Sequence, residues 1–202
     1  DKGIQLNLKS GESRILITSN KPVGEWKLGS KVKVNEKEAI AAADSKTIDL
    51  TENAWKLSFT EDAPKVGETF NLKGVKSWEG LSEKAKVMMG TGVYETTIKL
   101  SKDDAKKQWT IDLGDVRESA RVYINNKYVG CAWAVPYILN CKDALNKGKN
   151  TIRIEVTNLP ANRIAEMDRQ GVKWRKMKEI NVVDINYKKT TYENWTPVPS
   201  GL

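Results

Sequence analysis

The sequence of 202 residues contains no histidine, only two cysteines and no long apolar run. Without histidine, a Ser-His-Asp triad, a Cys-His dyad and any metal site with histidine ligands are excluded. Cys131 and Cys141 are too few for a zinc site of four thiolates or for a disulfide framework. They either pair, if their strands run side by side, or act as small buried apolar residues. Since a membrane span needs ~20 apolar residues, we expect none.

The chain also lacks an initiating methionine and a signal-peptide pattern, which predicts a mature or trimmed fragment. Its length suits one large domain, or one domain with an additional fragment, that can bury a core without a metal or disulfide. We expect residues 1–50 to contain preceding strands with a linker or small hairpin, a candidate end of an upstream β domain. Residues 51–202 then form the main domain.

The formal net charge is +8, and most of the positive charge is lysine. Lysines are interleaved with Asp and Glu along the chain, which is typical of a solvated surface. The densest basic stretch, "VKWRKMKEI" at 172–180, mixes aromatic and basic residues as nucleic-acid sites do. We expect no nucleic-acid partner, and weak nucleic-acid binding is the third of three hypotheses for this chain.

Alternation of apolar and polar residues is the main structural signal. In "TIRIEV", Ile152, Ile154 and Val156 alternate with Arg153 and Glu155, which puts the apolar side chains on one face of a strand. Short strands between turn residues predict an all-β fold with antiparallel sheets, either a sandwich or a jelly roll. The same alternation recurs in "IQLNL" (4–8), "AWKLSFT" (54–60), "YETTIKL" (94–100) and "QWTIDLG" (108–114).

Helical patterns are scarce. Residues 160–171 are either a short helix, with Pro160 near its start and Gly171 just past its end, or a long loop. We expect a helical turn between strands in residues 101–107 and a tight connection in residues 143–150.

We expect residues 120–133 to form a β-hairpin whose role is mainly structural rather than ligand binding. Asn125 and Asn126 suit a two-residue turn, because Asn tolerates positive φ better than most residues. Two registers are open for its strands. They pair Val122 with Val129, or Val122 with Cys131 and Ile124 with Val129.

Longer pieces of the chain carry family patterns. Three pieces in order resemble the sugar-binding jelly roll of family 2 glycoside hydrolases, although Asn126 stands where that family has glycine. They are "GTGVYETTIKL" (90–100), "WTIDLGDVRESARVYINNKYVG" (109–130) and "VPYILNCKDALNKGKNTIRIEVTN" (135–158).

Other pieces resemble the C-terminal part of family 106 α-L-rhamnosidases. They are "AWKLSFTEDAPKVGETFNLKGVKSWEG" (54–80), "VTNLPANRI" (156–164) and "NWTPVPSGL" (194–202), while "IQLNLKSGESRILI" (4–17) resembles the strands before that domain. The segment 165–193 is longer and more basic than the family pattern.

The resemblance covers residues 4–202 and implies a galactose-binding domain-like jelly-roll β-sandwich. It implies a secreted or periplasmic bacterial parent, most like a rhamnosidase, whose catalytic carboxyl pair lies on a (β/α)₈ barrel of ~250 residues. The length and alternating pattern of that barrel are absent here, and none of the 26 Asp and Glu residues sits in a catalytic motif. We therefore expect this chain itself to be noncatalytic.

Sugar binding needs exposed aromatic rings and short polar side chains that bond hydroxyl groups. Trp55 and Trp109 lie on apolar strand faces and are expected in the core, while Trp26 and Trp78 fit either environment. Loops at one end of a sandwich often carry function. The residues expected to face a sugar there, or equally to bond a neighbouring domain, are Trp133, Tyr137, Asn158, Asn162, Arg163, Asp168 and Trp174.

The main hypothesis is a noncatalytic carbohydrate-binding or accessory domain of a secreted, rhamnosidase-like glycoside hydrolase. Its partners would be a plant or other oligosaccharide or polysaccharide and the catalytic domain of the same parent chain. The alternative is a docking module of a family 2 β-galactosidase-type enzyme that binds no free sugar. No cofactor is expected; a structural Ca²⁺ suits a jelly roll, although no EF-hand spacing marks it.

Overall fold

The computed structural model describes residues 46–176, 185–186, 188 and 190–202. The chain divides into two compact units, Asp1–Leu50 and Thr51–Leu202. The strands expected in residues 4–17, the hairpin or linker expected after them and Trp26 lie outside the described residues. The fold described here is that of the second unit.

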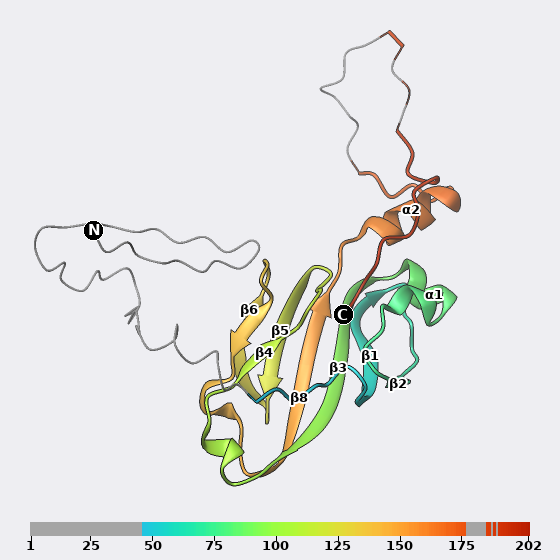
Figure 1. The fold of residues 1–202 in the computed structure, drawn as a ribbon. Coiled ribbons are helices and arrows are strands. Elements are labelled where there is room, and N and C mark those ends of the chain that lie inside the picture. The colour runs from blue at the N-terminus through green and yellow to red at the C-terminus, as the bar shows by residue number, and fades with distance from the viewer. Residues whose placement is uncertain (1–45, 177–184, 187, 189) are drawn as a thin grey trace, which may run out of the picture. The chain divides into compact units, whose positions relative to one another are not determined.

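A six-stranded antiparallel sheet forms the main layer, in the order β2-β1-β3-β8-β5-β6 (Figure 1). Its central pair, β3 and β8, runs in register from Thr91–Thr157 to Leu100–Gly148. The strands are β1 (Ala54–Ala63), β2 (Phe70–Lys73), β3 (Met89–Leu100), β5 (Ser119–Ile124), β6 (Lys127–Ala132) and β8 (Gly148–Thr157).

A second, two-stranded antiparallel sheet consists of β4 (Thr110–Asp112) and β7 (Ile138–Asn140). It packs directly on the main sheet, because a Cβ atom added at Gly130 of β6 would lie 3.2 Å from a methyl carbon of Leu139 in β7. Antiparallel sheets and few helices confirm the predicted all-β sandwich.

The alternation that predicted the strands also produces the core. Leu57, Tyr94, Ile154 and Val122 are direct neighbours across four strands and are at most 2% exposed. Burying such a row of apolar side chains contributes about 1.5–3 kcal/mol for each large aliphatic residue. The adjacent row, which points to the other face of the sheet, is polar and partly exposed.

The structure decides the role of Trp78 and tests the two tryptophans that were expected in the core. The short 3-10 turn η3 (Trp78–Gly80) puts Trp78 fully in the core, where a Cβ atom on Gly92 would lie 2.0 Å from its ring. Trp55 is buried as expected. Trp109 was also expected in the core, but it is only half-buried, and its indole nitrogen donates to the carbonyl oxygen of Asp104 at 2.8 Å.

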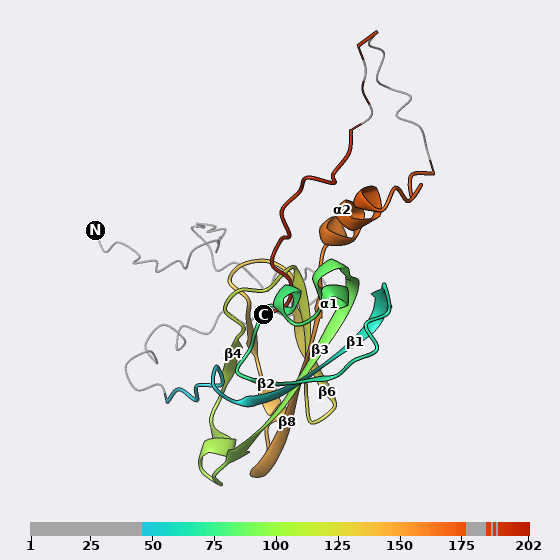
Figure 2. The same ribbon diagram turned by 90° about the vertical axis from the view of Figure 1, so that its right-hand side faces the viewer.

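The described part of the chain has two short α-helices, α1 (Glu83–Val87) and α2 (Ala161–Arg169). The side chain of Ser82 begins α1 by accepting a hydrogen bond from the amide of Ala85 at 3.2 Å. Helix α2 confirms the helical interpretation of residues 160–171. Both helices lie at the end of the sheet where β8 ends, and they contact each other (Figure 2). The predicted turn in 101–107 is the 3-10 helix η4 (Asp104–Lys106), and the connection in 143–150 opens with η5 (Lys142–Ala144).

The hairpin of β5 and β6 turns at Asn125 and Asn126, with φ of 52° and 63°, as predicted. Both predicted registers are wrong, because Val122 pairs with Gly130 while Tyr123 pairs with Tyr128. One extra residue on β6, Val129, makes a β-bulge, and simple alternation does not reveal a bulge. Cys131 on this strand is exposed and unpaired, and Cys141 is buried and also free.

The side chain of Asn125 explains why this turn is structural. Its amide nitrogen donates at 2.8 Å both to the carbonyl oxygen of Ala144 and to the side-chain oxygen of Asn150, and its oxygen accepts from the amide of Thr151 at 3.0 Å. Asn150 is fully buried and bonds both backbone atoms of Asn146 at 2.7 Å. The turn is therefore bonded to the connection before β8.

Candidate functional site

The polar residues expected to face a sugar begin at the end of β8. Asn158 is buried, and its side chain bonds backbone and side-chain atoms of the same chain. Its oxygen accepts from the amide of Gly90 at 3.0 Å, and its nitrogen donates to Met88 O at 3.0 Å and to Ser200 Oγ at 3.1 Å. The structure therefore uses Asn158 to join β3 and the C-terminal tail to the end of β8.

The C-terminal tail is bound along the same end of the sheet. Asn162 of α2 donates to Val198 O at 2.9 Å and accepts from Val198 N at 2.8 Å, as a neighbouring strand would. Ser200 is 1% exposed, and its amide donates to Ser77 Oγ at 3.0 Å. Asn162 thus holds the tail, whose Pro197 lines the groove described below.

Asp168 and Trp174 interact with each other after α2. The indole nitrogen of Trp174 donates to Asp168 Oδ1 at 2.7 Å, and the amide of Tyr192 donates to Asp168 Oδ2 at 2.8 Å. Trp174 is half-buried beside Tyr192, whose ring lies 4.4 Å from that of Trp195. The Trp174 ring therefore packs within the chain, while Trp195 is 48% exposed.

Helices α1 and α2 form the two sides of a groove of about 710 Å³, the α1–α2 groove. Its lining includes three apolar residues, Pro64, Val87 and Pro197. Asn162 and Arg163 are the predicted site residues among those that line it. Within the described residues, neither Trp133 nor Trp174 belongs to this lining, so an aromatic wall beside Arg163 is not what the groove offers.

The charged groups of the α1–α2 groove are four basic and two acidic side chains, a formal balance of +2. Glu166 is engaged on both oxygens, by Arg169 at 2.8 Å and by Gln170 at 2.7 Å. Glu83 is 93% exposed and lies 4.0 Å from Lys86. The remaining basic residues, Lys84 and Arg163, make no hydrogen bond or ion pair within the described part of the chain, and Arg163 is half-buried.

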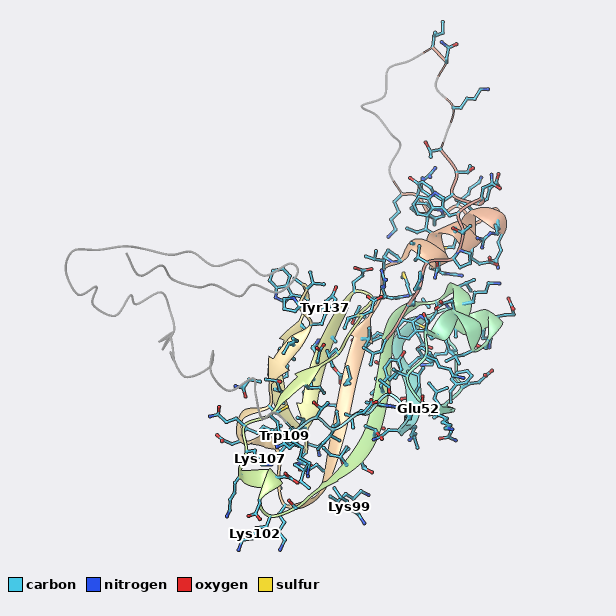
Figure 3. All side chains as sticks on the ribbon, in the orientation of Figure 1. Glu52, Lys99, Lys102, Lys107, Trp109 and Tyr137 are labelled. Carbon is cyan, nitrogen blue, oxygen red and sulfur yellow. The ribbon has the colours of Figure 1, made fainter. Side chains whose placement is uncertain are left out.

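Trp133 and Tyr137 lie at the same end of the sheet as α2, but they follow the edge strand β6, whereas α2 follows β8. Ala132, next to Trp133, is in register with Ala120, which pairs with Val156 near the end of β8. Because neighbouring strands are ~4.8 Å apart, this places Ala132 about 10 Å from Val156. Trp133 is 76% exposed. Tyr137, labelled in Figure 3, is half-buried. Its carbonyl oxygen accepts from Leu113 N at 2.9 Å.

Sequence reasoning missed the α1 side of the groove. Lys84, Lys86 and Glu83 belong to "SEKAK", which reads as an ordinary solvated stretch far from residue 163. The one available signal was Ser82, a helix-starting residue before a good helix former. An N-cap residue predicts that a helix begins, but it does not predict which distant element that helix will pack against.

Two further findings concern metals and membranes. Among the described residues, no three His, Cys, Asp or Glu side chains gather where they could hold a metal ion, so a calcium site stays a prediction. No helix in the described part is long and apolar enough to cross a membrane.

Comparison with known proteins gives three results. Residues 80–199 match the model of the family described as "Glycosyl hydrolase 2 galactose-binding domain-like". A protein of Formosa agariphila named "Putative beta-glucuronidase" is 26% identical over 96% of this chain and 18% of its own length. A rhamnosidase from Novosphingobium sp. PP1Y has the same fold over 78% of this chain and 14% of its own, with a TM-score of 0.60 at 24% identity.

Proposed function

The chain belongs to the galactose-binding domain-like family of glycosyl hydrolase 2, and we propose that it serves such an enzyme as a noncatalytic accessory domain that contacts carbohydrate. The observation that carries the proposal is the α1–α2 groove, a concave site lined by charged and apolar side chains that contains Arg163. Small-molecule sites are concave, have volumes in this range and combine apolar surface with a few polar groups.

The parent enzyme is proposed to be several times longer than this chain. The chain spans 18% of the curated relative and 14% of the rhamnosidase. The sequence patterns support a rhamnosidase-like parent, and the name of the Formosa relative supports a glucuronide-hydrolysing parent as well. In either case we propose a secreted or periplasmic enzyme whose catalytic domain is a partner of this one.

A docking role is the second candidate, and exposed apolar side chains favour it. Trp133, Val135 and Tyr128 are 76%, 53% and 55% exposed along β6 and the segment after it. A catalytic domain that covers them would bury apolar area at about 25 cal/mol per Å². If docking is their role, Trp133→Ala should weaken binding of the chain to the parent's catalytic domain and leave carbohydrate binding unchanged.

The proposal is tested by assaying the chain alone for hydrolysis and for binding. We expect no turnover of aryl-rhamnosides, aryl-glucuronides or aryl-galactosides at micromolar concentration across several pH values. Calorimetric titration with oligosaccharides should show binding without cleavage. Turnover that disappears on replacing one Asp or Glu would refute the noncatalytic role, and a chain that binds no saccharide would leave docking as its function.

A further inference from the structure

The charge of the α1–α2 groove is not balanced by its own acids. Glu166 is already paired with Arg169 at 2.8 Å and also accepts from Gln170 at 2.7 Å, so its charge is balanced by Arg169. Glu83 is almost fully exposed to water, and its attraction to other groups is screened there. Two cationic side chains that line one groove, Lys84 and Arg163, therefore remain available to a ligand.

These two side chains favour a particular ligand group. A guanidinium carries donors in a planar fork that fits two oxygens of a carboxylate or sulfate, and an ammonium adds a point charge without fixed direction. Half-burial of Arg163 strengthens such a contact, since it lowers the effective dielectric constant around the pair. A neutral hydroxyl would use only part of this capacity.

We infer that the α1–α2 groove binds saccharides that carry a carboxylate or sulfate, with Arg163 as the main anion contact and Lys84 as a second one. The inference rests on the proposed function and specifies its ligand class. The groove's volume of about 710 Å³ suits a short oligosaccharide. Pro64, Val87 and Pro197 offer apolar surface for the C–H faces of a ring.

A matched pair of ligands tests this inference. The 202-residue chain is titrated with a disaccharide that ends in glucuronic acid, with the same disaccharide ending in glucose, with a 6-sulfated form of the latter, and with sodium sulfate. We expect the two anionic disaccharides to bind about tenfold or more tightly than the neutral one, because hydrogen bonds between charged groups are the stronger kind. Sodium sulfate should bind much more weakly than either.

Variants assign the effect to the groove. Arg163→Gln should abolish the preference for the anionic disaccharides, Arg163→Lys should keep part of it, and Lys84→Gln should reduce it. The control is Lys102→Gln, an exposed lysine at the opposite end of the sheet (Figure 3), which should change nothing. Unchanged thermal midpoints confirm that the variants fold. If Arg163→Gln does not fold, Lys84→Gln provides the test of the groove instead.

The outcomes separate the inference from the proposed function. Equal affinity for the neutral and anionic disaccharides, unaffected by Arg163→Gln, would overturn the inference and keep a carbohydrate-binding domain. Loss of the preference in Lys102→Gln to the same degree would also overturn it, since the effect would then be one of overall charge. Binding of none of the saccharides would overturn both.

Discussion

Replacing Asn125 by alanine tests whether the hairpin turn is held by its side chain. The substitution removes three hydrogen bonds, to Ala144 O, Asn150 Oδ1 and Thr151 N. At ~1 kcal/mol net for each bond they contribute ~3 kcal/mol. A residue other than Gly, Asn or Asp at a positive φ, here 52°, costs ~1 kcal/mol more. We therefore expect the free energy of unfolding to fall by ~4 kcal/mol.

The matched control is the next residue. Asn126 also has a positive φ, of 63°, but its side chain is exposed and makes no hydrogen bond within the described residues. Asn126→Ala should therefore cost only the backbone part, ~1 kcal/mol. For a domain of this size, ~4 and ~1 kcal/mol correspond to falls in the melting temperature of about 10 °C and about 3 °C. Calorimetric melting measures both.

The result that would refute this reasoning is equal destabilisation by the two substitutions. In that case the buried amide of Asn150 would find other partners when Asn125 is lost, and the turn would be set by backbone preference alone. Asn125→Gly adds a check, because glycine removes the side chain without the cost of positive φ. It should retain most of the ~3 kcal/mol loss.

The remaining predictions concern the tail and a buried thiol. Gly201→Ala should destabilise the chain by ~2 kcal/mol more than Gly171→Ala in urea unfolding, because its Cβ atom would lie 2.2 Å from the Tyr94 hydroxyl while that of Gly171 has open space; equal effects would contradict the tail's placement. Burial raises the pKa of the Cys141 thiol from 9.0 to about 11, so the native chain keeps a proton that the unfolded chain releases. Stability should fall as the pH rises from 9 to 11, and a fall just as steep in Cys141→Ala would contradict this.

Much of the fold follows from local patterns in the sequence. Alternation located β1, β3, β4 and β8, because a two-residue period directly sets which side chains are buried. The turn at Asn125–Asn126 was predictable because few residues adopt positive φ. The register of β6 was not, since a bulge depends on how β6 fits its neighbours and leaves no mark in the alternation.

The candidate site was harder to predict for a physical reason. Asn162 and Asp168 were expected to bind hydroxyl groups, yet they bond Val198 and Tyr192, 36 and 24 residues further along the chain. A polar side chain after a strand can serve a ligand or a distant backbone segment equally well, and only the fold decides between them. Arg163 and Lys84 line one groove although they are far apart in sequence.

The measurement that tests the central claim most directly is a nuclear magnetic resonance titration of the chain with the glucuronic acid disaccharide. It reports binding, its location and any cleavage of the sugar in one sample. The account predicts shifts of backbone amides in α1 and α2, Lys84 and Arg163 among them, with little change near Lys102 and the disaccharide intact. Cleaved disaccharide, or shifts confined to the end of the sheet around Lys102, would contradict an accessory domain that binds carbohydrate in the α1–α2 groove.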